Sequence, residues 1–354
     1  MTNILTILTN DCLVEIFQHF KDDHQTLYKS IFVNKIFCEL AIPLLWRNPF
    51  AFIQKLNNKI LVIRTYLCFI NTHYFRYELL KLPKPYFEYY KFLREFELSS
   101  FQEGLREFIR HELKLKSSTN INKKINKIIK LFNEQLGNLL LNKDNHLNHL
   151  NVHYTDISRS ENQLNLCSLN DIDDVLLNIN KLSLEFSVLE NSSKVLIELI
   201  IRKKNNLQHL IISNKNTMNV YYNMIIKLLE SQQRLITLEI PALWISTSTL
   251  EIFEKFSCSL TFLKIKDDGI KCSTFFSLLD ILYNLRKFEA PSLYFHDNDF
   301  LNSLIIPVNK RYKLEYLNFT EPILLRPQIS YYRLVFEIIK AISNIVIPNI
   351  YLRQ

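Results

Sequence analysis

The stretch LQHLII at residues 207–212 returns as LITLEI at 235–240 and as LTFLKI at 260–265. All three follow the pattern LxxLxL, in which another apolar residue can replace a leucine. Alternating apolar and polar residues are typical of a strand with one buried face. Working outward from these segments, the pattern begins at Leu147, Ile179, Leu207, Leu235, Leu260, Leu285, Leu314 and Ile342. These starts lie 25 to 32 residues apart, which indicates a repeat architecture.

Helix-like segments separate the predicted strands. Two examples are NSSKVLIELIIRKK (191–204) and STSTLEIFEKFS (246–257). Each opens with a side chain that can accept the free N–H groups of a first helical turn. A strand and a helix in every unit stack into a solenoid, because no unit can bury its apolar side alone. We therefore expect an α/β solenoid with a parallel sheet, of the irregular leucine-rich-repeat horseshoe type.

The chain divides by pattern into three zones. Residues 1–50 predict a three-helix domain, residues 51–143 a helical linker, and residues 144–354 the repeat domain. Leu93 (LREFEL) indicates a possible earlier repeat inside the linker. The Asn or Cys that commonly follows eight residues after the first leucine of such a repeat is missing, so irregular units are expected. Residues 1–50 should also be removable, leaving a folded chain from about residue 84.

Glycine occurs only three times in 354 residues. Phosphate-binding loops need several close glycines, and neither these loops nor a GxSxG nucleophile turn is present. We therefore predict no enzyme activity and no cofactor. His146, His149 and His153 have metal-like spacing, but on a strand they would not share one face, so no metal site is expected.

The formal charge of +8 raises the question of nucleic acid. The basic residues are spread along the chain, so a nucleic-acid partner is not predicted unless they converge on one face. No apolar run reaches the roughly 18 residues that a membrane-spanning helix needs. The six cysteines form no CxxC pair, which favours a reducing compartment. The expectation is a cytoplasmic or nuclear protein without a membrane partner.

Residues 8–46 read LTNDCLVEIFQHFKDDHQTLYKSIFVNKIFCELAIPLLW and resemble the F-box motif. Together with the repeats, they make the chain similar to divergent fungal F-box proteins with leucine-rich repeats. The matching positions are Leu8, Leu13, Ile16, Phe17, Phe20, Val33, Leu45 and Trp46. Thr9, Asn34 and Phe37 stand where the family has proline, cysteine and tryptophan.

The resemblance implies a substrate-recognition subunit of an SCF-type cullin–RING ubiquitin ligase. The F-box would dock a Skp-type adaptor, and the repeats would bind a protein substrate. The implied adaptor-binding residues are Leu8, Thr9, Leu13, Ile16, Phe17, Phe20, Val33, Phe37 and Trp46. The alternative is a repeat-based interaction scaffold whose degenerate F-box has no ligase role.

The predicted strands also suggest a substrate surface. In LxxLxL the fourth and sixth residues point inward, so the third and fifth point to the open face. Glu239, Lys264 and Glu289 should then form a lateral charge ladder. The substrate-binding residues proposed from this face are His209, Phe262, Lys264 and Tyr316.

Overall fold

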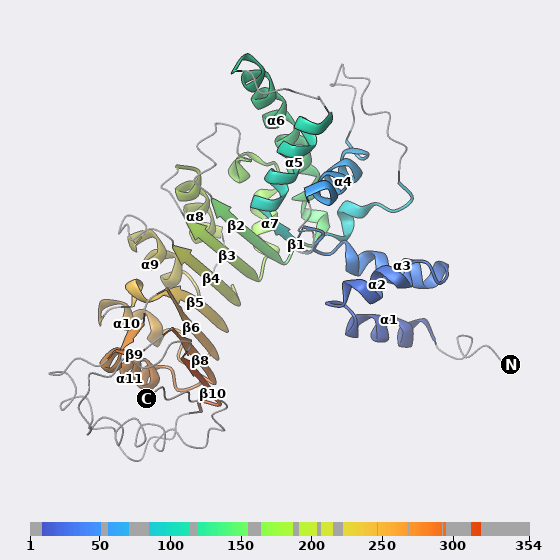
Figure 1. The fold of residues 1–354 in the computed structure, drawn as a ribbon. Helices are drawn as coiled ribbons and strands as arrows, with labels where there is room; N and C mark the ends of the chain where they lie inside the picture. The colour runs from blue at the N-terminus through green and yellow to red at the C-terminus, as the bar shows by residue number, and fades with distance from the viewer. Residues whose placement is uncertain are drawn as a thin grey trace, which may run out of the picture. The chain divides into compact units, whose positions relative to one another are not determined.

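The protein is an α/β structure with a mostly parallel sheet (Figure 1). The computed structural model describes residues 9–50, 56–70, 85–112, 119–154, 164–186, 191–203, 207–214, 222–245, 247–267, 269–291, 293–294 and 313–319. The chain divides into two compact units, Met1–Ile179 and Asn180–Gln354. None of the described helices is both long enough and apolar enough to cross a membrane.

The first unit contains seven α-helices and two strands in its described part. Their bounds are α1 Asn10–His19, α2 His24–Ser30, α3 Lys35–Leu45, α4 Leu56–Leu67, β1 Glu95–Glu97, α5 Leu98–Glu112, α6 Thr119–Leu140, β2 His149–Tyr154 and α7 Ile172–Asn178. Short 3₁₀ helices cover η4 Tyr89–Phe92, η5 Lys143–Asn145 and η7 Leu166–Ser168.

The second unit alternates strands and helices. Its described elements are β3 Lys181–Phe186, α8 Asn191–Lys203, β4 His209–Asn214, α9 Tyr222–Glu230, β5 Thr237–Pro241, η9 Ala242–Trp244, α10 Thr247–Glu254, β6 Phe262–Lys266, β7 Ile270–Lys271, α11 Cys272–Ile281, β8 Lys287–Ala290, β9 Leu293–Tyr294 and β10 Tyr316–Phe319. The helices α8 to α11 lie along one side of the strands (Figure 1).

The sheet follows the chain. In the first unit β1 pairs with β2, in the second unit the strand order is β3-β4-β5-β6-β8-β10, and β7 pairs with β9 in a separate ribbon. In the second unit the third residues of the predicted patterns are neighbours, from Lys181 through His209, Thr237, Phe262 and Lys287 to Tyr316. The register predicted from LxxLxL is therefore confirmed for these strands.

The earlier repeat at Leu93 is also present. Glu95 of β1 is the register partner of His149 of β2, and both are third residues of their patterns. Leu93 is fully buried, as the first position of a repeat requires. The last predicted repeat, at Ile342, lies outside the described residues.

The same pair of backbone hydrogen bonds recurs between successive repeats. The residue before a strand has a carbonyl that accepts two N–H groups from the next repeat. One comes from the residue before the next strand, and the other comes from the first residue of that strand. Asn180 accepts from Gln208 and His209 at 2.9 and 3.0 Å, and Gln208 accepts from Ile236 and Thr237 at 2.8 and 3.0 Å. The carbonyls in this position are those of Arg94, Asn180, Gln208, Ile236, Thr261 and Arg286, and the carbonyl of Arg47, which precedes no strand, accepts the N–H groups of Arg94 and Glu95 in the same way.

Two buried side-chain amides form hydrogen bonds with backbone groups near the turns between helices and strands. Gln232 is 1% exposed, and its side-chain oxygen accepts the Leu207 N–H at 3.1 Å, across 25 residues of chain. Its nitrogen donates to the Leu228 carbonyl at 3.2 Å. Asn145 donates in the same way to the carbonyls of Leu139 and Leu140. These side chains satisfy buried backbone groups that would otherwise lack a partner.

Candidate functional site

The first three helices form a small module with little interior, which we call the helical module (α1–α3). Its core consists of Phe17, Leu27 and Ala41, with half-buried neighbours such as Phe37 around it. The rings of Phe17 and Phe37 meet edge to face at 5.2 Å. Three short helices offer few inward positions, so a core of this size leaves apolar side chains over.

Polar side chains fix where these helices begin. Thr9 accepts the Cys12 N–H at the start of α1, and Asp23 accepts the Thr26 N–H at 3.0 Å at the start of α2. Asn34 accepts the Phe37 N–H at 2.8 Å and begins α3. Asn34, which departs from the F-box pattern, thus has a structural task of its own as an N-cap.

The apolar side chains left over lie at the surface of the module. Among the residues that the structure describes, fourteen large apolar side chains are exposed, and seven of them belong to this short segment. They are Val14, Ile16, Phe20, Tyr28, Phe32, Val33 and Ile36, with exposed fractions between 37% and 70%. We call these seven the apolar face.

Two pairs of residues spaced four apart belong to the apolar face. Ile16 and Phe20 are four residues apart on α1 and therefore share one side of that helix. Tyr28 and Phe32 are also four apart, and their rings meet edge to face at 5.3 Å. Exposed apolar side chains that cluster in one short segment in this way are candidates for contact with a partner.

The nine predicted adaptor-binding residues differ in exposure, and only some of them lie at the surface. Ile16, Phe20 and Val33 are on the apolar face, whereas Leu13 and Phe17 are buried at 5% and 4% exposure. Thr9 is an N-cap, and Leu8 lies outside the described residues. The exposed residues Val14, Tyr28, Phe32 and Ile36 are additional to that prediction.

Trp46 belongs to a different contact. Its ring lies 4.2 Å from Tyr89 and 5.5 Å from Tyr66, which is fully buried in α4. The next residue, Arg47, has the first of the repeated accepting carbonyls. The packing therefore joins residues 46–50 to α4 and β1, so the three-helix segment ends at about residue 45 and not at 50.

Glu95 concentrates polar contacts beside that junction. Its carboxylate accepts from Arg47 at 2.8 Å and from the Asn48 side chain at 3.0 Å, and His149 Nδ1 lies 3.4 Å away. The hydrogen bond with His149, followed by the Arg47 charge and the Asn48 bond, lowers the pKa of Glu95 to about 2, although burial opposes the shift. Glu95 therefore stays charged at neutral pH.

The predicted substrate residues lie on neighbouring strands of the second unit. His209 on β4 contacts the Thr237 hydroxyl on β5 at 2.8 Å through Nδ1. Phe262 on β6 and Tyr316 on β10 are half-buried, with β8 between them. All four predicted residues share the outward face of one sheet.

The predicted charge ladder exists in part. Lys264 Nζ lies 2.9 Å from Glu289, and this hydrogen bond is the main cause that raises the pKa of Lys264. Glu239, however, pairs with Lys266 at 3.0 Å. Lys266 is opposite Pro241 in register, and its Nζ also donates to Ser213 on β4 at 3.0 Å.

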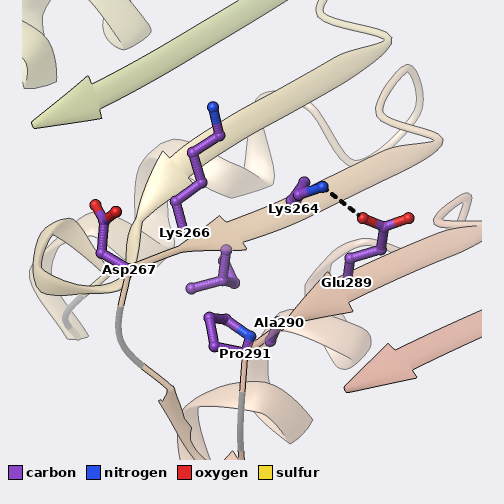
Figure 2. Close-up of a pocket in the computed structure, with 7 residues that line it drawn as sticks. Lys264, Lys266, Asp267, Glu289, Ala290 and Pro291 are labelled. Atoms are coloured by element: carbon purple, nitrogen blue, oxygen red, sulfur yellow. Dashed lines mark ion pairs between the residues drawn. The ribbon is translucent and has the colours of Figure 1, made fainter. Parts of the chain in front are cut away.

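A hollow of about 220 Å³ opens at the carboxyl ends of β6 and β8 (Figure 2). Its lining residues are Lys264, Ile265, Lys266, Asp267, Glu289, Ala290 and Pro291. Asp267 has a positive φ of 69° at the end of β6, a backbone state that aspartate tolerates better than most residues. In Figure 2 the Lys264–Glu289 pair borders the hollow, and Lys266 points towards the neighbouring strands.

Comparison with known proteins adds no family name. No protein-family model matches the sequence, and no curated protein matches it.

Proposed function

We propose that this protein is the substrate-recognition subunit of an SCF-type cullin–RING ubiquitin ligase, built from an F-box and irregular leucine-rich repeats. The helical module would dock a Skp-type adaptor, and the repeat strands would hold a protein substrate. The observation that carries the proposal is the apolar face, because half of the large exposed apolar side chains among the described residues gather on Val14–Ile36.

Burial of this face in a partner would stabilise both the contact and the module. A fully buried Ile or Phe side chain contributes about 1.5–3 kcal/mol relative to an exposed one. Burial of these residues in a partner would therefore add favourable free energy to docking. The F-box resemblance of residues 8–46 supports a Skp-type adaptor as that partner.

The outward sheet face supports the second half of the proposal. It carries aromatic, cationic and acidic side chains on consecutive strands, in a register that keeps them in rows. Such mixed surfaces suit protein partners, in which a few aromatic and charged side chains contribute most of the binding free energy. The role requires no catalytic residue in this chain.

Calorimetry with a purified Skp-type adaptor tests the docking. Ile16→Asp places a charge in the apolar contact and should abolish measurable binding, while the far-ultraviolet circular dichroism stays unchanged because Ile16 is 40% exposed. Val195→Asp is the matched control, since Val195 is 45% exposed on α8 in the second unit.

Two results would contradict the ligase proposal. One is a wild-type chain that is folded and does not bind the adaptor, which would favour the scaffold alternative. The other is an Ile16→Asp variant that binds as well as Val195→Asp, because the apolar face would then have no part in docking.

A further inference from the structure

Lys287 occupies a distinctive place on the outward sheet face. It is exposed at the third position of β8, and its register partners are Phe262 on β6 and Tyr316 on β10. Neighbouring strands are about 4.8 Å apart, so the two half-buried rings flank the lysine. The row therefore presents a cation between two apolar walls.

The other lysines of these strands are already neutralised. Lys264 pairs with Glu289, and Lys266 pairs with Glu239. Lys287 makes no ion pair with any residue in the part of the chain that the structure describes. The charge available to a partner at this point is consequently positive.

The hollow lies towards the carboxyl ends of β6 and β8 (Figure 2). Ile265, Ala290 and Pro291 contribute apolar surface to it. Its lining residues after Lys287 are Glu289, Ala290 and Pro291, and the last of them is four residues beyond Lys287, which corresponds to about 13 Å at the rise of a strand. An extended peptide covers the same length with four residues, and its side chains at i and i+4 point to the same side.

We propose that this stripe binds an extended, acidic segment of the substrate. An aspartate or glutamate side chain contacts Lys287 between Phe262 and Tyr316, and an apolar side chain four residues away enters the hollow. The assignment rests on the proposed function, since it names the class of substrate for the repeat surface. Charge complementarity selects the acidic residue, and the apolar lining selects its neighbour.

A synthetic peptide array probed with the purified full-length chain tests the assignment. Each peptide holds one Asp and one Leu at the spacing i, i+2, i, i+3 or i, i+4, with either residue first. All other positions are mixtures of residues. Matched peptides replace Asp by Asn or Lys, and Leu by Ser. We expect the strongest signal for Asp and Leu at the i, i+4 spacing.

Charge reversal then locates the contact. Lys287→Glu should weaken binding of the best peptide about tenfold, as measured by fluorescence polarisation, and should favour the Lys peptides. Lys181→Glu is the matched control, because Lys181 is the third residue of β3 and its partner on β4 is His209. Lys181→Glu should leave binding unchanged.

The outcomes separate this inference from the ligase role. Equal signals for Asp, Asn and Lys peptides, or equal losses for Lys287→Glu and Lys181→Glu, overturn the acidic-segment assignment while leaving adaptor docking intact. If the Asp–Leu preference depends on Lys287 and the same preparation does not bind the adaptor, the peptide surface stands and the ligase role is wrong.

Discussion

The helical module and the repeat strands distribute apolar residues in opposite ways. The module has a core of Phe17, Leu27 and Ala41 and exposes seven large apolar side chains. In β6 and β8 of the second unit, the fourth and sixth positions are buried, and Lys264 and Lys266 of the open face pair with glutamates of neighbouring strands. A helix of about ten residues buries one stripe, whereas a central strand gains a neighbour on each side. The module therefore leaves apolar surface that a partner could cover, as we propose, while each repeat buries its apolar side against the next repeat.

The largest difference in stability should be between two shortened chains that begin at different residues. A chain starting at residue 46 should keep one cooperative unfolding transition, whereas a chain starting at 84 should lose structure around α5. The second cut removes Phe50, Ile63 and Tyr66, all at most 2% exposed, and each buried side chain of this size contributes about 1.5–3 kcal/mol. Urea unfolding followed by circular dichroism compares the two.

This result would replace our expectation from sequence that a chain from about residue 84 stays folded. Equal stability of the two shortened chains would show that α4 belongs with the helical module, contrary to its packing on α5. Gly104 of α5 illustrates that packing, because a Cβ there would lie 3.2 Å from the Lys59 Cβ of α4.

A pair of phenylalanine truncations probes the two cores. Phe288→Ala should destabilise the repeat strands by about 3–5 kcal/mol, since the ring is fully buried against Phe275 at 4.8 Å. Phe17→Ala should instead reduce adaptor binding and leave the main unfolding midpoint in place. A large shift of that midpoint by Phe17→Ala would mean that the module and the repeats unfold together.

The buried amide of Gln232 should have a smaller effect. Gln232→Leu conserves volume but leaves the buried Leu207 N–H without its acceptor, which costs about 1–3 kcal/mol. The neighbouring exposed Gln233→Leu is the control and should change stability by less than about 0.5 kcal/mol. Chemical denaturation measures both, and equal effects would argue against this bridge between units.

Glu95 gives a pH dependence with a defined sign. Its pKa falls from 4.5 to about 2 in the folded protein, so its stabilising contribution is present above pH 4.5 and is lost as the pH falls from there towards 2. Glu95→Gln should lower stability by about 1–2 kcal/mol at pH 6 and flatten the profile below pH 5. Unfolding midpoints at pH 3.5 and pH 6 test this, and parallel profiles would contradict it.

The smallest effect should come from the open face of the sheet. Lys264→Ala removes an ion pair whose lysine is 39% exposed, and exposed pairs contribute only about 0–1 kcal/mol. Thermal unfolding should barely change, and any difference should shrink in high salt. A loss above about 2 kcal/mol would mean that this surface stabilises the fold in addition to any binding role.

Much of the repeat architecture could be predicted because the pattern has a period of two within strands and of 25 to 32 residues between them. The place of Lys264 beside Glu289 followed from the same alternation of residues within strands. The pairing of Glu239 with Lys266 could not be predicted, because the register places Lys264 opposite Glu239, and the long lysine side chain of Lys266 reaches it from two residues further along β6.

The apolar face was harder to predict for a physical reason. Leu27 and Tyr28 are adjacent apolar residues on one short helix, yet the first is fully buried and the second is 59% exposed. Helical spacing identifies apolar stripes but does not say which stripe faces the core when several compete. Only the packing of all three helices decides that.

Because the same pair of backbone hydrogen bonds joins each repeat to the next, a whole repeat could be removed and the repeats on either side could pair with each other. Gln208 and Ile236 occupy equivalent places, each donating to the unit before it and accepting from the unit after it. Excision of residues 208–235 would join Leu207 to Ile236 and restore the reading LITLEI at the junction. The Ile236 and Thr237 N–H groups would then meet the Asn180 carbonyl, and the chain would lose one strand and one helix with every remaining strand in register.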